Sequence, residues 1–315
     1  MPRILLLVTS PRLPAGLLTA AAWDAVRAQP VLAAAETPLT AAVREAGGAL
    51  TIVAPRVDTL LEHARAGDVV WLAGPTGDPD LARELGLRLA REPGLAELEV
   101  TYGSWDPAGA RLLDAVAVMD RLYSPGGDPW KRAQTHQSLA QFLLEEAYEA
   151  YDAIEAEDLT GLREELGDVL LQVVLHARLA EELPEGRRWS VDDVAAGLVD
   201  KMIRRNPHVF AGTEVGSVEE IIDNWEQIKK AEKSRDSVMD GVALAQPALA
   251  LAAKFLQRAE RAGLTVELPT GDDLGARLLR LVAAARAAGE DPEASLRAAA
   301  RRYADAARAA ERSSS

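Results

Sequence analysis

The sequence has no cysteine, a deficit of basic residues and no long apolar run, and each absence excludes a class of protein. Without cysteine the chain cannot form disulfides, use a thiol nucleophile or hold zinc through thiolates. Its 35 basic residues stand against 49 acidic ones, for a formal net charge of −14. This balance argues against a nucleic-acid-binding protein, because that affinity comes largely from Lys and Arg at phosphates. No apolar run approaches the roughly 20 residues that a bilayer span needs, so we expect no membrane protein.

What remains is the composition of a globular protein. The chain has 315 residues, of which 48% are hydrophobic and 27% charged, and this predicts two or three domains with buried cores. Its first residues carry one basic side chain before a short apolar run, which predicts a β-strand rather than a signal peptide. We therefore expect a cytoplasmic protein.

Residues 1–110 predict an α/β domain with a small parallel sheet. Apolar runs at 4–8, 49–53 and 69–72 are typical of buried strands, and helix-like segments lie between them at 16–28 and 80–91. Strands that alternate with helices indicate parallel βαβ units. The turn that follows the first run contains no glycine, so a phosphate or cofactor cannot approach the backbone closely there.

The rest of the chain predicts two all-α domains, residues 111–235 and 236–315. Apolar residues recur at three- and four-residue spacing over 138–157, 160–182 and 191–205. Either Asp158 or Thr160 can cap the second of these helices, and Ser190 with Asp193 resembles a capping box for the third.

Acidic residues gather in two of these helices. Glu145, Glu146 and Glu149 fall within an arc of roughly 100° on the first, and Glu165 and Asp168 share a face of the second. A short loop between the helices makes them antiparallel and can set these carboxylates opposite one another. Because no adequate cluster of bases is interleaved with them, Mg²⁺ or Mn²⁺ suits so many hard oxygen ligands.

Two other readings of these acids stay open at this point. They can form an ordinary solvated acidic helix face. They can also belong to a di-iron bundle, although that chemistry uses Glu-x-x-His pairs and no His stands three residues after any of these acids.

Four ordered motifs resemble the MazG family of nucleoside triphosphate pyrophosphohydrolases. The acids follow its EExxE…ExxD signature. Residues 127–136 resemble its CPWDxxQTH segment, with Asp128 in place of Cys and Lys131 in place of Asp. Residues 200–210 resemble its DKxxRRHPHVF box, with Asn206 in place of His, and residues 224–229 resemble its WexiK segment.

The resemblance implies a four-helix domain that forms a homodimer and hydrolyses an NTP or dNTP to the monophosphate and pyrophosphate, with the clearing of non-standard nucleotides as one role. It implies Mg²⁺ (or Mn²⁺) on Glu146, Glu149, Glu165 and Asp168, while Glu145 would orient or deprotonate the attacking water. The substrate-binding candidates on the matching motifs are Lys201, Arg204, Arg205, Trp130, Lys131, His136, Trp225 and Lys229. Since residues 204 and 205 point about 100° apart on a helix, we expect only one of these arginines to reach the substrate.

The flanking domains resemble degraded relatives. Residues 1–110 are faintly similar to a tetrapyrrole methylase domain that has lost its glycine-rich loop, so we expect no methyl transfer. Residues 236–315 are similar to a second MazG repeat in which Asp273 and Ala276 stand at the ExxD positions and one acidic helix is missing, so we expect no metal there. Three alternatives remain: a nucleotide-binding regulator with little turnover, a narrower relative that acts on dUTP, dCTP or phosphoribosyl-ATP, and a methyltransferase.

Overall fold

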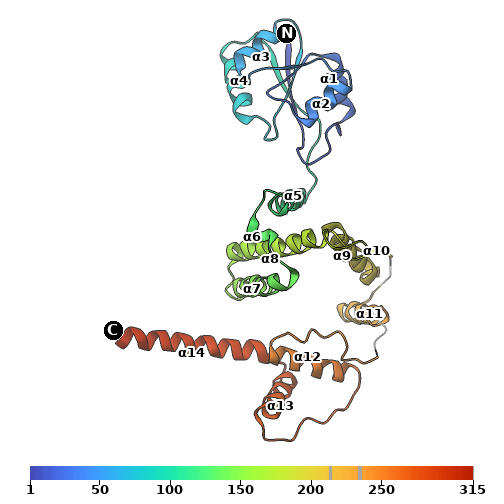
Figure 1. Ribbon diagram of the computed structural model, residues 1–315, viewed down its shortest axis with the longest axis vertical. Coiled ribbons are helices and arrows are strands. Elements are labelled where there is room, and N and C mark those ends of the chain that lie inside the picture. The colour runs from blue at the N-terminus through green and yellow to red at the C-terminus, as the bar shows by residue number, and fades with distance from the viewer. Residues whose placement is uncertain (213–214, 233–235, 315) are drawn as a thin grey trace. The chain divides into compact units, whose positions relative to one another are not determined.

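The computed structural model describes residues 1–212, 215–232 and 236–314, without the side chains of residues 223, 226, 229–231 and 314 (Figure 1). The chain divides into two compact units, Met1–Leu198 and Val199–Ser315, and the division falls inside helix α9 (Val191–Arg205). The boundaries at 110/111 and 235/236 remain predictions. No helix in the described part of the chain is long and apolar enough to cross a bilayer.

The first unit begins with a parallel five-stranded sheet, as the sequence predicts. Its strand order is β3-β2-β4-β1-β5. The strands are β1 (Arg3–Val8), β2 (Val31–Ala33), β3 (Leu50–Ile52), β4 (Val69–Leu72) and β5 (Glu97–Tyr102). Strands β2 and β5 were not predicted. Strand β2 has only three residues, too few to show a period, and β5 is an edge strand whose residues are mostly exposed.

Two helices cover each face of the sheet (Figure 1). They are α1 (Ala20–Ala28), α2 (Pro38–Glu45), α3 (Val57–Ala64) and α4 (Pro79–Arg91). Strand β1 shows how the alternation of a strand builds both cores. Ile4 and Leu6 pack with the apolar residues of α3 and α4, whereas Leu5 and Leu7 pack with those of α1 and α2.

The turn after β4 is organised around one carboxylate. Asp78 accepts hydrogen bonds from the Trp71 indole N–H and from the backbone N–H of Gly74, each at 2.9 Å. This turn follows a central strand of the sheet, where parallel α/β folds usually bind ligands. An anionic ligand would meet the Asp78 carboxylate here.

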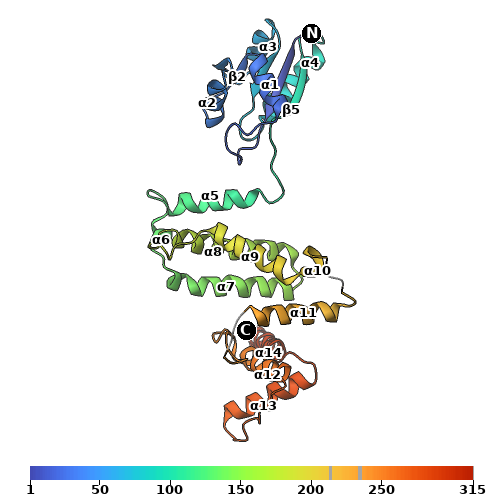
Figure 2. The ribbon, with the colours of Figure 1, turned by 90° about the vertical axis from the view of Figure 1, so that its right-hand side faces the viewer.

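The helical part of the first unit packs three long helices side by side (Figure 2). Its helices are α5 (Arg111–Tyr123), the short α6 (Pro129–Arg132), α7 (His136–Glu155), α8 (Leu159–Ala180) and the first part of α9. Their core contains Met119 and Tyr123 of α5, Leu139 of α7 and Leu175 of α8.

In the described residues of the second unit, all regular structure is helical. After the end of α9 it contains α10 (Pro207–Phe210), α11 (Val218–Ala231), α12 (Ala248–Arg261), α13 (Leu274–Ala287) and α14 (Pro292–Ser314). Helices α12, α13 and α14 contact one another, and Arg286 forms an ion pair with Glu260 at 2.9 Å. Asp273 stands at a metal-ligand position of the MazG repeat that residues 236–315 resemble. Here it caps α13 by accepting a hydrogen bond from the backbone N–H of Ala276.

Candidate metal centre

Well-defined helix ends fix the register of α7 against α8. Thr135 and Ser138 form a reciprocal capping box at the start of α7. Glu157 adopts a positive φ of 55°, and Asp158 then caps α8 by accepting the backbone N–H groups of Thr160 and Gly161. Of the two predicted caps, the structure therefore uses Asp158. The tight turn makes the two helices antiparallel and brings their acidic faces together.

Three of the four predicted metal ligands form one group. Glu146 of α7 and Glu165 and Asp168 of α8 each offer a carboxylate oxygen, and these atoms lie within 4.8 Å of one another. Glu149 lies beside the group, because its charge is among the causes that raise the pKa of both Glu146 and Glu165. The four acids thus occupy one place on the surface of the α7–α8 pair.

Among the residues that the structure describes, these carboxylates have no basic partner. Burial is the main cause that raises the pKa of Glu146, followed by the charges of Asp168, Glu149 and Glu145. Burial likewise raises the pKa of Glu165, followed by the charge of Glu149. In the described part of the chain, no Lys or Arg forms an ion pair with these acids. Clustered oxygen donors without a basic partner fit a hard divalent cation.

Glu145 stands beside this group rather than in it. Its side chain is exposed, and its charge is among the causes that raise the pKa of Glu146. A carboxylate that is next to a ligand in the chain, and is not itself in the ligand group, can act as a base toward a molecule bound there.

The two residues that depart from the family pattern in the α6 segment pair with each other. Asp128 caps α6 by accepting the Trp130 backbone N–H at 2.9 Å, and its carboxylate lies 3.2 Å from the Lys131 ammonium. The Lys131 ammonium also lies over the Trp130 ring, which meets Phe142 edge-on at 5.8 Å. Trp130 as a whole remains 51% exposed, so Lys131 and Phe142 do not cover it completely.

His136 is engaged within its own chain. Its Nδ1 lies 2.7 Å from Nδ1 of His176, and the two rings stack with centroids 5.0 Å apart. Trp189 stacks on His136 with centroids 6.1 Å apart. Burial, and then the neighbouring His136, lower the pKa of His176.

The predicted cations of α9 differ in their surroundings. Arg205 is largely buried, pairs with Glu232 at 2.5 Å and lies over the Trp225 ring. Arg204 is 53% exposed and pairs with the same carboxylate at 2.7 Å. Lys201 precedes them on α9 and is partly exposed. The side chain of Lys229 lies outside the described residues.

One polar residue of this region escaped the sequence prediction. Gln172 is 4% exposed, and its side-chain amide shares a hydrogen bond with Glu146. The signal was present in the sequence, because Gln172 interrupts an apolar run of α8 and stands one helical turn after Asp168.

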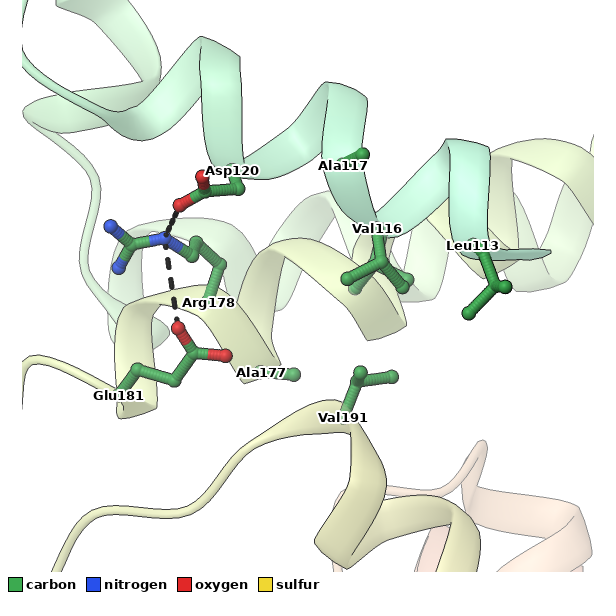
Figure 3. Close-up of a pocket in the computed structure, with 9 residues that line it drawn as sticks. Leu113, Val116, Ala117, Asp120, Ala177, Arg178, Glu181 and Val191 are labelled. Carbon is green, nitrogen blue, oxygen red and sulfur yellow. Dashed lines mark hydrogen bonds and ion pairs between the residues drawn. The ribbon is translucent and has the colours of Figure 1, made fainter. Parts of the chain in front are cut away.

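A separate hollow of about 350 Å³ lies between α5 and α8, with Val191 at its edge (Figure 3). Its polar end is formed by Arg178, whose Nε lies 2.7 Å from Asp120 and 3.7 Å from Glu181. No predicted site residue lines it. Because the arginine is paired with acids of its own chain, the lining offers a phosphate no free positive charge.

Comparisons with known proteins agree with the motifs. The model of the MazG nucleotide pyrophosphohydrolase domain matches residues 134–210. Over 244 residues the chain is 47% identical to an uncharacterised 26.1 kDa protein of Streptomyces cacaoi, a match that covers 76% of this chain and 99% of that protein. Over 220 residues it is 34% identical to a nucleoside triphosphate pyrophosphohydrolase/pyrophosphatase MazG of Thermotoga maritima, which covers 62% of this chain and 84% of the relative.

A mycobacterial relative matches over a shorter stretch. The chain is 50% identical over 160 residues to the nucleoside triphosphate pyrophosphohydrolase of Mycobacterium tuberculosis, covering 51% of this chain and 48% of that protein. The chain thus spans about half the length of this relative.

Proposed function

The chain belongs to the MazG family of nucleotide pyrophosphohydrolases, which hydrolyse acid anhydride bonds, and we propose that it converts nucleoside triphosphates and their deoxy forms into monophosphate and pyrophosphate. The observation that carries this proposal is the group of carboxylates on α7 and α8 that has no basic partner in the described part of the chain. Its position within the matched segment, residues 134–210, supports the same activity.

Glu146, Glu149, Glu165 and Asp168 are the residues that would hold a divalent cation, with Mg²⁺ as the first choice and Mn²⁺ as the second. Such an ion supplies charge neutralisation of the triphosphate oxygens. The carboxylates keep their ligand oxygens close together even though burial and mutual repulsion oppose it. Binding of a divalent cation would relieve this repulsion between the carboxylates.

Glu145 is the residue proposed to orient the attacking water and accept its proton. The water oxygen forms a bond to one of the two phosphorus atoms of the anhydride that joins the monophosphate and pyrophosphate parts, this anhydride bond breaks, and the other part leaves with the bond electrons. A carboxylate that is exposed and adjacent to the ligand group, but not a member of it, suits this role.

Lys201 and Arg204 are proposed to contact the phosphates. Arg205 is the less suitable of the two arginines, because Glu232 and Trp225 already hold its guanidinium. The 53% exposure of the Arg204 side chain supports the choice of this arginine. Lys229 and Trp225 keep the substrate role that the family motif implies.

The exposed Trp130 ring is proposed to stack on a nucleobase, with Lys131 beside it. His136 is better suited to an indirect role, because it stacks on His176 and Trp189 within its own chain.

We also expect a homodimer. Large apolar side chains of α7 and α8 remain exposed, which is unusual for a surface that meets only water. They are Leu143, Leu144, Tyr148, Ile154, Leu159 and Leu166. Light scattering coupled to size-exclusion chromatography measures the mass directly, and a mass near 33.7 kDa would contradict this expectation.

The experiment that tests the function is product analysis over a panel of ribo- and deoxynucleoside triphosphates, with Mg²⁺ and with EDTA. Metal-dependent release of monophosphate and pyrophosphate would support the proposal and rank the bases. Release of orthophosphate with a diphosphate, or tight nucleotide binding without turnover, would overturn it in favour of a regulator.

A further inference from the structure

A buried glutamine contacts the carboxylate group through Glu146. Gln172 lies on α8 one turn beyond Asp168, and among the described residues the only other buried polar side chains are Thr40 and Ser104. A buried amide is costly unless its hydrogen bonds are made. Its hydrogen bond to Glu146 must run from the amide N–H, because an ionised carboxylate only accepts.

The other end of the same amide lacks a partner. Oε1 of Gln172 is fully buried and accepts no hydrogen bond from the described residues. One further turn along α8, Nε2 of His176 is also buried without a partner in the described part of the chain. Residues four apart lie on the same helix face, with about 5–6 Å between their Cβ atoms. Since neither atom has a partner among the described residues, they do not bond to each other directly, but one water molecule between them can join them.

The contact between the two histidines restricts which nitrogen donates and which accepts the hydrogen bond. Only one proton fits between Nδ1 of His136 and Nδ1 of His176, which are 2.7 Å apart, so one nitrogen donates and the other accepts. If Nε2 of His176 carries its proton, it can donate toward Gln172, and its Nδ1 then accepts from His136. With the proton on Nδ1 instead, two acceptors would face each other on α8.

We propose that Gln172 is a positioning residue of the carboxylate group, and that a one-directional hydrogen-bond ladder from His136 through His176 holds its amide in place. The ladder ends at Glu146, whose carboxylate keeps its remaining lone pairs for a cation. This inference rests on the proposed function, because it assigns a support to a proposed metal ligand.

The ladder explains why an amide stands at this position. A carboxylate at residue 172 would add another negative charge beside Glu146 and Asp168, whereas an aliphatic side chain would leave Glu146 free to rotate. Groups that orient a metal ligand in this way change metal affinity by roughly 10- to 100-fold when they are removed. We therefore expect metal affinity, rather than folding, to report the loss of Gln172.

The test is Mn²⁺ binding to the full chain without nucleotide, followed by the electron paramagnetic resonance signal of free Mn²⁺. Gln172→Met, which keeps the length of the side chain, should raise the dissociation constant by roughly 10- to 100-fold with no fall in melting temperature. Gln141→Met, at an exposed position of α7, is the matched control and should bind as the wild type does.

The outcomes separate this inference from the proposed function. If the wild type binds Mn²⁺ and Gln172→Met binds it with equal affinity, the positioning role alone is overturned. A wild-type chain that binds no Mn²⁺ would overturn the proposed metal site and the positioning role together. Weak binding accompanied by a loss of fold in Gln172→Met leaves the decision to a measurement on the wild-type chain.

That measurement is the ¹⁵N spectrum of the histidine ring nitrogens in the metal-free chain, assigned by replacing each of the four histidines in turn. The ladder requires a proton on Nε2 of His176 and one on Nδ1 of His136. A proton on Nδ1 of His176 would overturn it.

Discussion

The guanidinium of Arg205 lies against the carboxylate of Glu232, with Nη2 at 2.5 Å and Nε at 3.1 Å from the same oxygen. Arg204 contacts the other oxygen at 2.7 Å. One carboxylate therefore joins two consecutive arginines of α9 to the end of α11. Both arginines hold the pKa of Glu232 at about 2, below its ordinary value of 4.5.

This ion pair predicts an acid-sensitive contribution to stability. A depressed carboxyl pKa stabilises the fold above pH 4.5, and the stabilisation is lost as the pH falls towards 2. Glu232→Gln should therefore lower the melting temperature at pH 7, and the difference from the wild type should shrink as the pH falls from 4.5. Thermal unfolding between pH 7 and pH 3 measures it. The exposed Glu267→Gln is the control, and a difference that is constant with pH would contradict the prediction.

Removal of Glu145 should separate turnover from metal binding. Glu145→Gln is expected to lower kcat by roughly 10²- to 10⁴-fold, the range for loss of a general base, and to change the Mn²⁺ dissociation constant little. Steady-state pyrophosphate release and Mn²⁺ titration check the two parts. Glu164→Gln provides a control at an exposed acid of α8. A kcat like that of the wild type would remove Glu145 from the proposed mechanism.

Neutralising Glu146 should stabilise the metal-free chain. The fold raises the pKa of the Glu146 carboxyl. The carboxyl therefore favours the folded chain at a pH below the pKa that it has in the unfolded chain. This contribution to stability is lost as the pH rises through the pKa that it has in the folded chain. Glu146→Gln should therefore increase the melting temperature at pH 7 in EDTA, by roughly 2 °C. Added Mg²⁺ should stabilise the wild type and not the variant, because only a chain that binds the ion gains stability from it. Equal Mg²⁺ shifts in both chains would place the ion elsewhere.

Disruption of a second arginine cluster should cause local opening of the chain rather than loss of activity. Arg12, whose side chain is 11% exposed, forms ion pairs with Asp106 and with Asp114 at the start of α5. Arg12→Met should increase hydrogen exchange in the first turn of α5 and speed proteolysis after residue 103. Arg111→Met is the matched control, because Arg111 also pairs with Asp114 but is 84% exposed. Identical exchange in both variants would mean that Arg12 does not hold this segment.

Local patterns predicted much of the helical framework. The predicted helix over 191–205 has those bounds, and the predicted ends of α7 and α8 differ from the observed ones by two residues or fewer. Caps and apolar spacing depend on near neighbours in the chain, so the sequence displays them directly. Strand β5 shows the opposite case, since its pairing with β1 depends on residues more than 90 positions away.

The candidate site divides in the same way. The spacing of acids within each helix predicted that Glu146, Glu165 and Asp168 come together, and the structure places them in one group. The partners of Arg205 and of His136 could not be predicted, because Glu232 and His176 are 27 and 40 residues distant. Gln172 was overlooked although it interrupts an apolar run of α8, because the prediction followed the repeated spacing of the acids and a single amide has no repeat.

The cap of α6 has a chemical consequence of its own. The oxygen that accepts the Trp130 N–H belongs to Asp128, at a position where the resembling family has a thiol. A carboxylate is inert to peroxide, to alkylating reagents and to disulfide exchange, all of which attack thiolates. With no cysteine elsewhere in the chain, the segment that carries Trp130 and Lys131 keeps its helix start under oxidising conditions. Under oxidative stress the four methionines of this protein would therefore be oxidised before the start of that helix was affected.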